Sequence, residues 1–329
     1  MENEMVNANG NREGSMRGPR VCAVALLSLV SLSSSCASFA KSDAFLSGRP
    51  MGKIESDALR ELSGIAASRR NPGVLYVHND SGDAPQIYAI NEKAQLLGAC
   101  RLQGATERDW EDIAVGPGPD PNQSYVYIGD IGDNAAKRPE IIVYRVPEPK
   151  VDAVAPFGRM TIGTADALRC VYPDKPHDAE TLLVDPLTRD IYIISKRELA
   201  PRVYRAAYPQ STTQQIKLEQ VAVLPLGSFP TGGDVSPDGR RVIVRGMFNA
   251  AIWERPVGGR SSDSGSRVGD PVPLGQAFAG QPKAIPVAAE PQGEAICFDS
   301  KGAGYFTISE GRHPSLYYFA PAEPNSPRP

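Results

Sequence analysis

In Asp109-Trp-Glu-Asp-Ile-Ala114, acidic residues lead into a short apolar strand. A Pro/Gly-rich turn then connects this strand to a second one, Tyr125-Val-Tyr-Ile128. The polar run Gly129-Asp-Ile-Gly-Asp-Asn134 follows, and Ile141-Ile-Val-Tyr-Arg-Val146 supplies a third strand. Short runs of β-branched and aromatic residues between Pro/Gly turns indicate antiparallel β-structure. This unit decides the fold because the chain repeats it.

Four further copies begin with Glu61-Leu-Ser-Gly-Ile-Ala66, His177-Asp-Ala-Glu-Thr-Leu182, Gly232-Gly-Asp-Val235 and Gly293-Glu-Ala-Ile296. The aligned apolar positions Ile65, Ile113, Leu182, Val235 and Ile296 are 48, 69, 53 and 61 residues apart. Repeats of roughly 40–50 residues are typical of four-stranded propeller blades. The sequence therefore predicts an all-β, five-bladed β-propeller, with six blades or a two-sheet sandwich as alternatives.

Each blade needs a fourth strand, and the apolar stretches 95–102, 160–172, 218–224 and 267–274 are the candidates. The fifth repeat has no apolar stretch after Phe319 that could form its fourth strand. Residues 42–58 precede the first repeat, so we expect them to supply the missing outer strand and close the ring.

The amino-terminal segment has the layout of an export signal. Arg17 and Arg20 precede an apolar run over 21–32, which is too short for a comfortable membrane span. Cleavage after Ala40 is one expectation. Lipidation of Cys36 in a bacterial lipoprotein box is the other, although Leu32 stands four residues before the cysteine instead of three. The predicted plan is a signal over 1–40, one propeller over 41–320 and a disordered Pro-rich tail over 321–329, in a periplasmic or extracellular protein.

The composition is that of a globular protein with a sizeable core, since 41% of the residues are hydrophobic. Lys and Arg total 35 against 38 Asp and Glu, so nucleic acid is not an expected partner, and we expect a monomer. Beyond the signal, Cys100, Cys170 and Cys297 lie in apolar runs. Buried free thiols are the favoured interpretation, and a Cys100–Cys170 disulfide is the alternative.

Acidic residues gather at one end of the predicted blades. The tight turns between first and second strands share one face of a propeller, here called the turn face. The segments that enter first strands and leave second strands share the opposite face, here called the mouth face. Carboxylates that converge there repel one another unless a cation offsets them, and oxygen ligands suit Ca²⁺. The expected cation ligands are Glu61, Asp80, Asp112, Asp130, Asp133, Asn134, Asp178, Asp234, Glu294 and Glu310.

Two functions are consistent with such a face. In the first, an exported hydrolase binds a divalent cation that polarises a phosphoryl or ester oxygen. Glu111, Glu180 or His78 would then act as the base, Lys196 or Arg245 would stabilise developing negative charge, and His177 and His313 would line the pocket. In the second, a non-catalytic envelope propeller uses the face to bind a protein, peptide or glycan. No nucleophile elbow, phosphate-binding loop or zinc motif is present in the sequence.

The segments 61–66, 77–83, 109–114, 128–134 and 178–182 carry a resemblance. They resemble a largely uncharacterised family of secreted or lipoprotein-type bacterial β-propellers, over most of residues 55–319. More remotely, the blade pattern is similar to phytase-like esterase and SdiA-regulated propellers. The resemblance implies the fold, and it leaves the chemistry open because propellers serve many functions.

Overall fold

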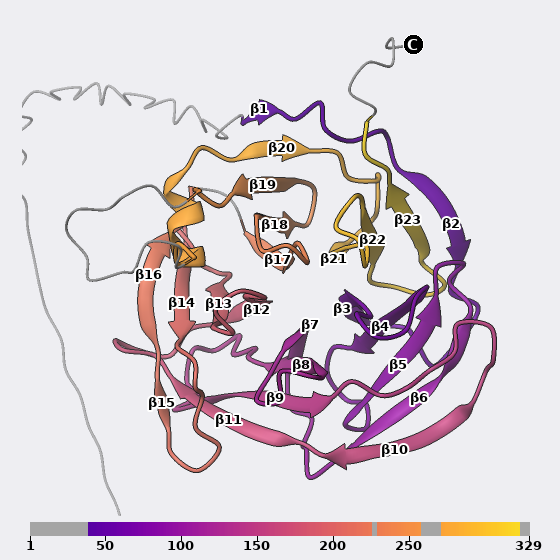
Figure 1. Cartoon of the computed structure of the whole chain (residues 1–329), viewed down its shortest axis with the longest axis horizontal. Helices are drawn as coiled ribbons and strands as arrows, with labels where there is room; N and C mark the ends of the chain where they lie inside the picture. The colour runs from indigo at the N-terminus through magenta and orange to yellow at the C-terminus, as the bar shows by residue number, and fades with distance from the viewer. Residues whose placement is uncertain (1–38, 226–228, 258–270, 323–329) are drawn as a thin grey trace, which may run out of the picture. The chain divides into compact units, whose positions relative to one another are not determined.

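Five small sheets surround a central axis in the computed structural model, which describes residues 39–225, 229–257 and 271–322 (Figure 1). The chain divides into residues 1–35 and 36–329, and every described residue belongs to the second part. The sheets form a five-bladed β-propeller, so the predicted fold class and blade number are confirmed. Within the described ranges, no helix is long and apolar enough to cross a membrane. The predicted signal run over 21–32, Cys36 and residues 323–329 lie outside these ranges.

Three strands that are consecutive in sequence make the inner part of each blade, and we number the blades one to five in chain order. These strands are β3 (Leu62–Ala67), β4 (Val74–Asn79) and β5 (Gln86–Asn91); β7 (Trp110–Pro117), β8 (Ser124–Asp130) and β9 (Ile141–Pro147); β12 (Ala179–Val184), β13 (Ile191–Ser195) and β14 (Arg202–Ala206); β17 (Pro230–Val235), β18 (Arg241–Gly246) and β19 (Ala250–Glu254); and β21 (Gly293–Phe298), β22 (Tyr305–Ser309) and β23 (Ser315–Phe319).

The outer strands of the five blades are β6 (Leu96–Gln103), β11 (Asp166–Val171), β16 (Glu219–Val223), β20 (Lys283–Ile285) and β2 (Arg49–Lys53). Three blades carry an additional parallel strand at the outer edge. These strands are β10 (Gly158–Thr164) on β6, β15 (Ile216–Lys217) on β11 and β1 (Ala40–Lys41) on β20. They cover edges that would otherwise expose unpaired backbone groups.

Two predicted outer strands need correction. The stretch 160–172 holds two strands in different blades, because β10 joins blade one and β11 joins blade two. For blade four, residues 267–270 lie outside the described ranges, and residues 271–274 lead into the 3₁₀-helix η1 (Leu274–Ala279). The outer strand of that blade is the three-residue β20.

The amino-terminal segment closes the ring, as predicted. Strand β2 pairs antiparallel with β23, with Arg49 opposite Tyr318 and Lys53 opposite Ser315. Blade five is therefore completed by a strand from the other end of the described chain (Figure 1).

The core lies between neighbouring blades, and the inner strands β3, β12, β17 and β21 are buried at every residue. Runs such as Ile191-Tyr-Ile-Ile194 pack well there because branched and aromatic side chains suit a pleated surface. Cys100, Cys170 and Cys297 are free and buried, which confirms the favoured interpretation and shows that the disulfide alternative is wrong.

Each inner strand contains a β-bulge at its mouth-face end. The unpaired residues are Ser63, Glu111, Glu180, Thr231 and Glu294. The residue two positions after the bulge is Ile113 in blade two and Gly233 in blade four. The sequence alignment placed Val235 opposite Ile113, so it was wrong by two residues. A bulge takes its side chain out of the regular alternation of a strand, and in three blades that side chain is glutamate.

Candidate functional site

In four blades, a backbone hydrogen bond joins the loop after the second strand to the segment that enters the first strand of the same blade. The amides of Asp80, Lys196 and Glu310 donate to the carbonyls of Glu61, Asp178 and Gln292 at 2.7, 2.9 and 3.0 Å, and Gly132 N donates to Asp109 O at 3.2 Å. Each accepting residue lies two positions before a bulge. The loop after the second strand is therefore fixed beside the bulge residue of its own blade.

Three carboxylates meet where blades one and two adjoin. Oxygens of Asp80, Asp109 and Glu111 lie within 4.8 Å of one another. Among the described residues, none of the three side chains accepts a hydrogen bond or forms an ion pair, and Glu111 is only 5% exposed. Buried carboxylates normally have partners, so the lack of one at Glu111 sets this cluster apart and makes it a candidate cation site.

Asp109 was not among the predicted ligands. It lies two residues before its bulge, the position that Glu61 and Asp178 occupy in blades one and three. That equivalence was available in the aligned repeats, so a position-by-position comparison of the copies would have identified it.

Burial and mutual repulsion disfavour ionisation of this cluster. Burial raises the pKa of Asp80 to about 7, and the carboxylates of Asp109, Glu310 and Glu61 add to the rise. Burial also raises the pKa of Glu111 well above its ordinary value, with further repulsion from Glu180 and Asp80. The pKa of Asp109 is raised by burial and by Asp178. A bound cation would remove this penalty.

A glycine allows the backbone to approach the cluster. A Cβ atom on Gly132 would lie 2.2 Å from Glu111 Oε1 and 2.5 Å from Asp109 Oδ2. Any side chain at this position would therefore displace two of the three carboxylates.

We expect Gly132→Ala to lower the affinity of the cluster for a divalent cation at least about tenfold, since the new methyl group overlaps two ligands. Isothermal titration calorimetry with Ca²⁺ measures the change. Gly163→Ala is the matched control because a Cβ there meets no atom within 4 Å. Equal affinity of Gly132→Ala and the unsubstituted protein would contradict the ligand assignment.

One lysine lies among the bulge glutamates. Lys196 Nζ forms an ion pair with Glu180 Oε2. Burial alone would lower the pKa of Lys196, but Glu180, Glu294 and Glu111 outweigh it and the pKa is raised. Burial raises the pKa of Glu180 to about 7 against the opposing charge of Lys196. Burial raises the pKa of Glu294 to about 8, and Glu180 and Glu310 add to the rise.

Glu61 and Glu310 lie at the edge of this group. Burial raises the pKa of Glu310, with a contribution from Glu61, and both residues act on Asp80. The groups that act on one another at the mouth include seven carboxyl groups and one lysine: Glu61, Asp80, Asp109, Glu111, Glu180, Glu294, Glu310 and Lys196.

Asp112 and Asp234 do not join this group, because they connect blades. Asp112 Oδ2 accepts hydrogen bonds from Leu182 N at 2.9 Å and Gly233 N at 3.3 Å, in blades three and four. Asp234 Oδ2 accepts a hydrogen bond from Phe298 N in blade five at 2.9 Å. Both carboxylates are occupied by backbone amides, which leaves them poorly placed as cation ligands.

The loop after β8 uses its polar residues internally. Asp130 forms a buried ion pair with Arg138 at 2.7 Å, and Asp133 Oδ2 accepts a hydrogen bond from Arg138 N at 2.6 Å. Asp178 Oδ1 accepts a hydrogen bond from Asp133 N at 2.8 Å. Arg197 binds Asp178 Oδ2 at 2.6 Å and also bonds to Asn134 Oδ1. These four predicted ligands thus hold the loops of blades two and three together.

His78 lies in the core of blade one, fully buried, with its ring in edge contact with Trp110. Its Nδ1 is 2.7 Å from Asn79 O, and Nε2 has no hydrogen-bond partner among the described residues. Burial lowers the pKa of His78 to about 4. The side chain has no access to the mouth, so it does not suit the role of base.

Arg245 is also fully buried. It forms an ion pair with Glu290 at 2.5 Å and donates to Ala295 O at 3.1 Å. Both hydrogen bonds are internal to the fold, so Arg245 stabilises the packing between blades four and five, and its predicted role in stabilising negative charge stays a prediction.

The other two histidines lie outside the cluster. His177 is buried between Glu198 Oε1, 2.9 Å from Nδ1, and Asp174, 3.1 Å from Nε2. His313 is exposed, and its Nδ1 lies 2.8 Å from Ile54 O. Both residues tie loops of their own blades to neighbouring segments.

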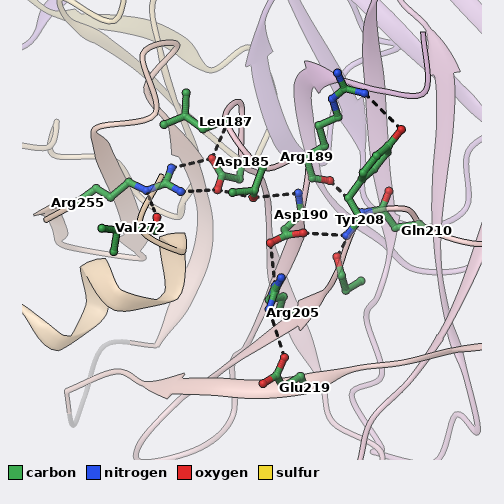
Figure 2. A network of polar contacts seen from close by, with 12 residues as sticks. Asp185, Leu187, Arg189, Asp190, Arg205, Tyr208, Gln210, Glu219, Arg255 and Val272 are labelled. Atoms are coloured by element: carbon green, nitrogen blue, oxygen red, sulfur yellow. Dashed lines mark hydrogen bonds and ion pairs between the residues drawn. The ribbon is translucent and has the colours of Figure 1, made fainter. Parts of the chain in front are cut away.

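On the turn face, two buried acids with a structural role accept hydrogen bonds from arginine side chains or backbone amides. Asp185 accepts hydrogen bonds from both terminal nitrogens of Arg255 at 2.8 and 2.9 Å (Figure 2). Asp190 accepts hydrogen bonds from Arg205 Nε and Tyr208 N, both at 2.8 Å. In contrast to these partnered acids, the side chains of Asp80, Asp109 and Glu111 have no hydrogen-bond or ion-pair partner among the described residues.

The comparisons with known proteins do not decide the function. No family model and no curated protein matches the chain. Among solved structures, the chain is similar to hydrazine synthase of Kuenenia stuttgartiensis, with a TM-score of 0.39, 10% identity and coverage of 76% of this chain and 80% of that one. It is also similar to a chain of a nidogen/laminin complex, with a TM-score of 0.39, 13% identity and coverage of 76% and 72%. At such values the likeness carries no argument about chemistry.

Proposed function

We propose that this propeller binds a divalent cation, with Ca²⁺ as the first candidate, through Asp80, Asp109 and Glu111, and that it hydrolyses an ester-type bond beside that cation. The observation that carries the proposal is the convergence of three carboxylates without protein partners, one of them almost fully buried. Hard oxygen ligands of this kind suit Ca²⁺. When bound, the cation would polarise a carbonyl or phosphoryl oxygen.

The neighbouring residues supply an acid and a base. Lys196 opposes the rise in the pKa of Glu180, which burial brings to about 7, so Glu180 is partly ionised near pH 7 and its carboxylate can accept a proton from water. Glu294 has its pKa raised by burial to about 8, so it is mainly protonated near pH 7 and suited to donate a proton. Two carboxyl groups with different environments can divide acid and base work in this way.

Glu111→Gln is expected to weaken Ca²⁺ binding by about 100-fold, since it replaces a ligand charge with an amide. Calorimetry on chelator-treated protein measures the affinity, and thermal melting with and without Ca²⁺ measures the stabilisation. Glu92→Gln, an exposed acid at a turn-face hairpin, is the matched control and should behave as the unsubstituted protein does.

No bound ion and an unchanged melting temperature in the presence of chelator would overturn the cation site. Cation binding without turnover of any ester would favour the non-catalytic alternative, in which the same face binds a protein, peptide or glycan. We also propose that the protein is exported, on the basis of the apolar run that follows Arg17 and Arg20.

A further inference from the structure

An open cavity of about 590 Å³ lies between the outer part of blade three and the helix η1. One wall is formed by residues of β13, β14 and β16, and the other by η1 and the proline that precedes it. Small-molecule sites in proteins usually have volumes of roughly 300–1,000 Å³. Asp80, Asp109 and Glu111 do not line this cavity, so it is separate from the candidate cation site.

Contacts within the protein hold both walls of the cavity in place. Gly275 of η1 lies so close to β16 that a Cβ atom on it would be 3.1 Å from Val221 Cγ2. Arg255 donates from Nε to Val272 O at 2.5 Å, just before η1, and its terminal nitrogens bind Asp185 of blade three (Figure 2). The start of η1 is thereby tied to blade three, and the cavity is formed before any ligand binds.

One buried hydrogen-bond donor in the cavity wall is unused. Tyr192 lines the cavity and is fully buried, and no described group accepts the proton of its hydroxyl. Its ring edge faces Gly275, since a Cβ atom there would lie 3.8 Å from Tyr192 Cε1. Burial raises the pKa of Tyr192 and the Gly275 amide opposes the rise, so the hydroxyl also lies beside Gly275. Because buried hydroxyls normally have partners, this one is suited to an acceptor atom of a bound molecule.

The charged groups around Tyr192 already have partners. Arg205 and Glu219, which line the cavity, form an ion pair at 3.5 Å, and Arg205 Nε binds Asp190 Oδ2 at 2.8 Å (Figure 2). Asp185, which also acts on Tyr192, is bound by the arginine that anchors η1. A charged ligand would lose its hydration here without gaining a free counter-charge, so an uncharged ligand fits the cavity better.

The remaining lining is largely apolar and includes an aromatic ring. Phe278 lines the cavity, and its ring packs at 65° against that of Trp253, with the ring centroids 5.5 Å apart. Val221 and Pro273 add further apolar surface. Flat aromatic ligands bind well to walls of this kind because offset and edge-to-face contacts between rings are favourable.

We propose that this cavity binds a small, uncharged aromatic molecule, and that a carbonyl oxygen of the molecule accepts a hydrogen bond from the Tyr192 hydroxyl. The inference goes beyond the proposed function, because none of the residues that carry it belongs to the cation cluster.

Two probes of similar shape test the hydrogen bond. Acetophenone carries a carbonyl oxygen, and ethylbenzene lacks it. Saturation-transfer difference NMR titrations measure both affinities, and a Kd of about 1 mM is expected for acetophenone from its small size. Tyr192→Phe should weaken acetophenone binding about fivefold, as the loss of one hydrogen bond predicts, and leave ethylbenzene binding unchanged. This variant should melt within about 2 °C of the unsubstituted protein, since the hydroxyl proton has no internal acceptor to lose.

A second variant tests the location of the site. Val223 lines the cavity and is 47% exposed, so a larger side chain there does not require repacking of the core. Val223→Trp should weaken the binding of both probes at least about tenfold, because the indole ring occupies the cavity. Val154→Trp is the matched control, since Val154 is 86% exposed and does not line the cavity, and it should leave both affinities unchanged.

Several results would overturn the proposal. They are an absence of acetophenone binding to the unsubstituted protein, full binding in Val223→Trp, and an equal effect of Tyr192→Phe on the two probes. A marked fall in the melting temperature of Tyr192→Phe would show that the hydroxyl has an internal partner, which would also overturn it. Chelation of Ca²⁺ should leave both affinities unchanged, so this proposal and the cation site stand or fall separately.

Discussion

Replacing Arg245 with methionine is expected to destabilise the fold by about 3–5 kcal/mol without weakening Ca²⁺ binding. The guanidinium is fully buried and paired with Glu290 at 2.5 Å, so its loss leaves a buried carboxyl without its counter-charge. Burial already raises the pKa of Glu290, with Arg245 opposing the rise, so the lone side chain would take up a proton. Urea unfolding measures the free energy, and calorimetry measures Ca²⁺ affinity.

The double variant Arg245→Met, Glu290→Gln is the control for this pair. It removes both charges and should recover much of the lost stability, as is found when a whole buried ion pair is replaced. A single variant that unfolds like the unsubstituted protein but binds Ca²⁺ poorly would place Arg245 in the binding site after all.

The second large expected effect is a decrease in the stability of the folded protein as pH rises, which a bound cation should counteract. Burial raises the pKa of Asp80 and Glu180 to about 7 and that of Glu294 to about 8, from 3.8 for aspartate and 4.5 for glutamate. As pH rises from about 4 to 8, the unfolded chain loses these protons before the folded protein does. Folding is therefore favoured at low pH, and this contribution is lost as pH rises through 7 and 8.

Ca²⁺ should have little effect on melting at pH 5, where the carboxyls retain their protons, and a large effect at pH 8. A free Ca²⁺ concentration about 100-fold above the Kd should raise the Tm by about 5 °C or more at pH 8. Differential scanning calorimetry at the two pH values, with Ca²⁺ or chelator, measures the difference. Equal stabilisation at pH 5 and pH 8 would show that these carboxyls do not control the binding.

The fold could be predicted because its signals are local. Each blade repeats an apolar strand, a Pro/Gly turn and a second apolar strand, and these features survive the differences in spacing. The outer strand of blade four carried no such signal. Lys283–Ile285 has three residues and pairs with β19 only because the preceding segment returns to that edge.

The site was predicted only in outline, for a physical reason. Sequence order places the acids on one face, but the pairing register determines where each side chain points. Glu111 is the unpaired bulge residue and joins the cluster, whereas the next residue, Asp112, binds backbone amides of two other blades. The environment of Arg245 could not be predicted either, because its partner Glu290 lies in an irregular segment 45 residues away in the sequence.

The hydrogen bonds that Asp112 accepts from blades three and four affect how a small molecule can move along the central axis. One carboxylate of blade two holds blades three and four at once, and the inner strands β7 and β17 contact each other although they are not neighbours in the ring. Among the described residues, the axis is therefore spanned below the mouth. A molecule at the mouth-face end of the axis therefore cannot cross to the turn face between these strands. Under the proposed function, substrate and product would share that one end, and a single compound bound there should block both.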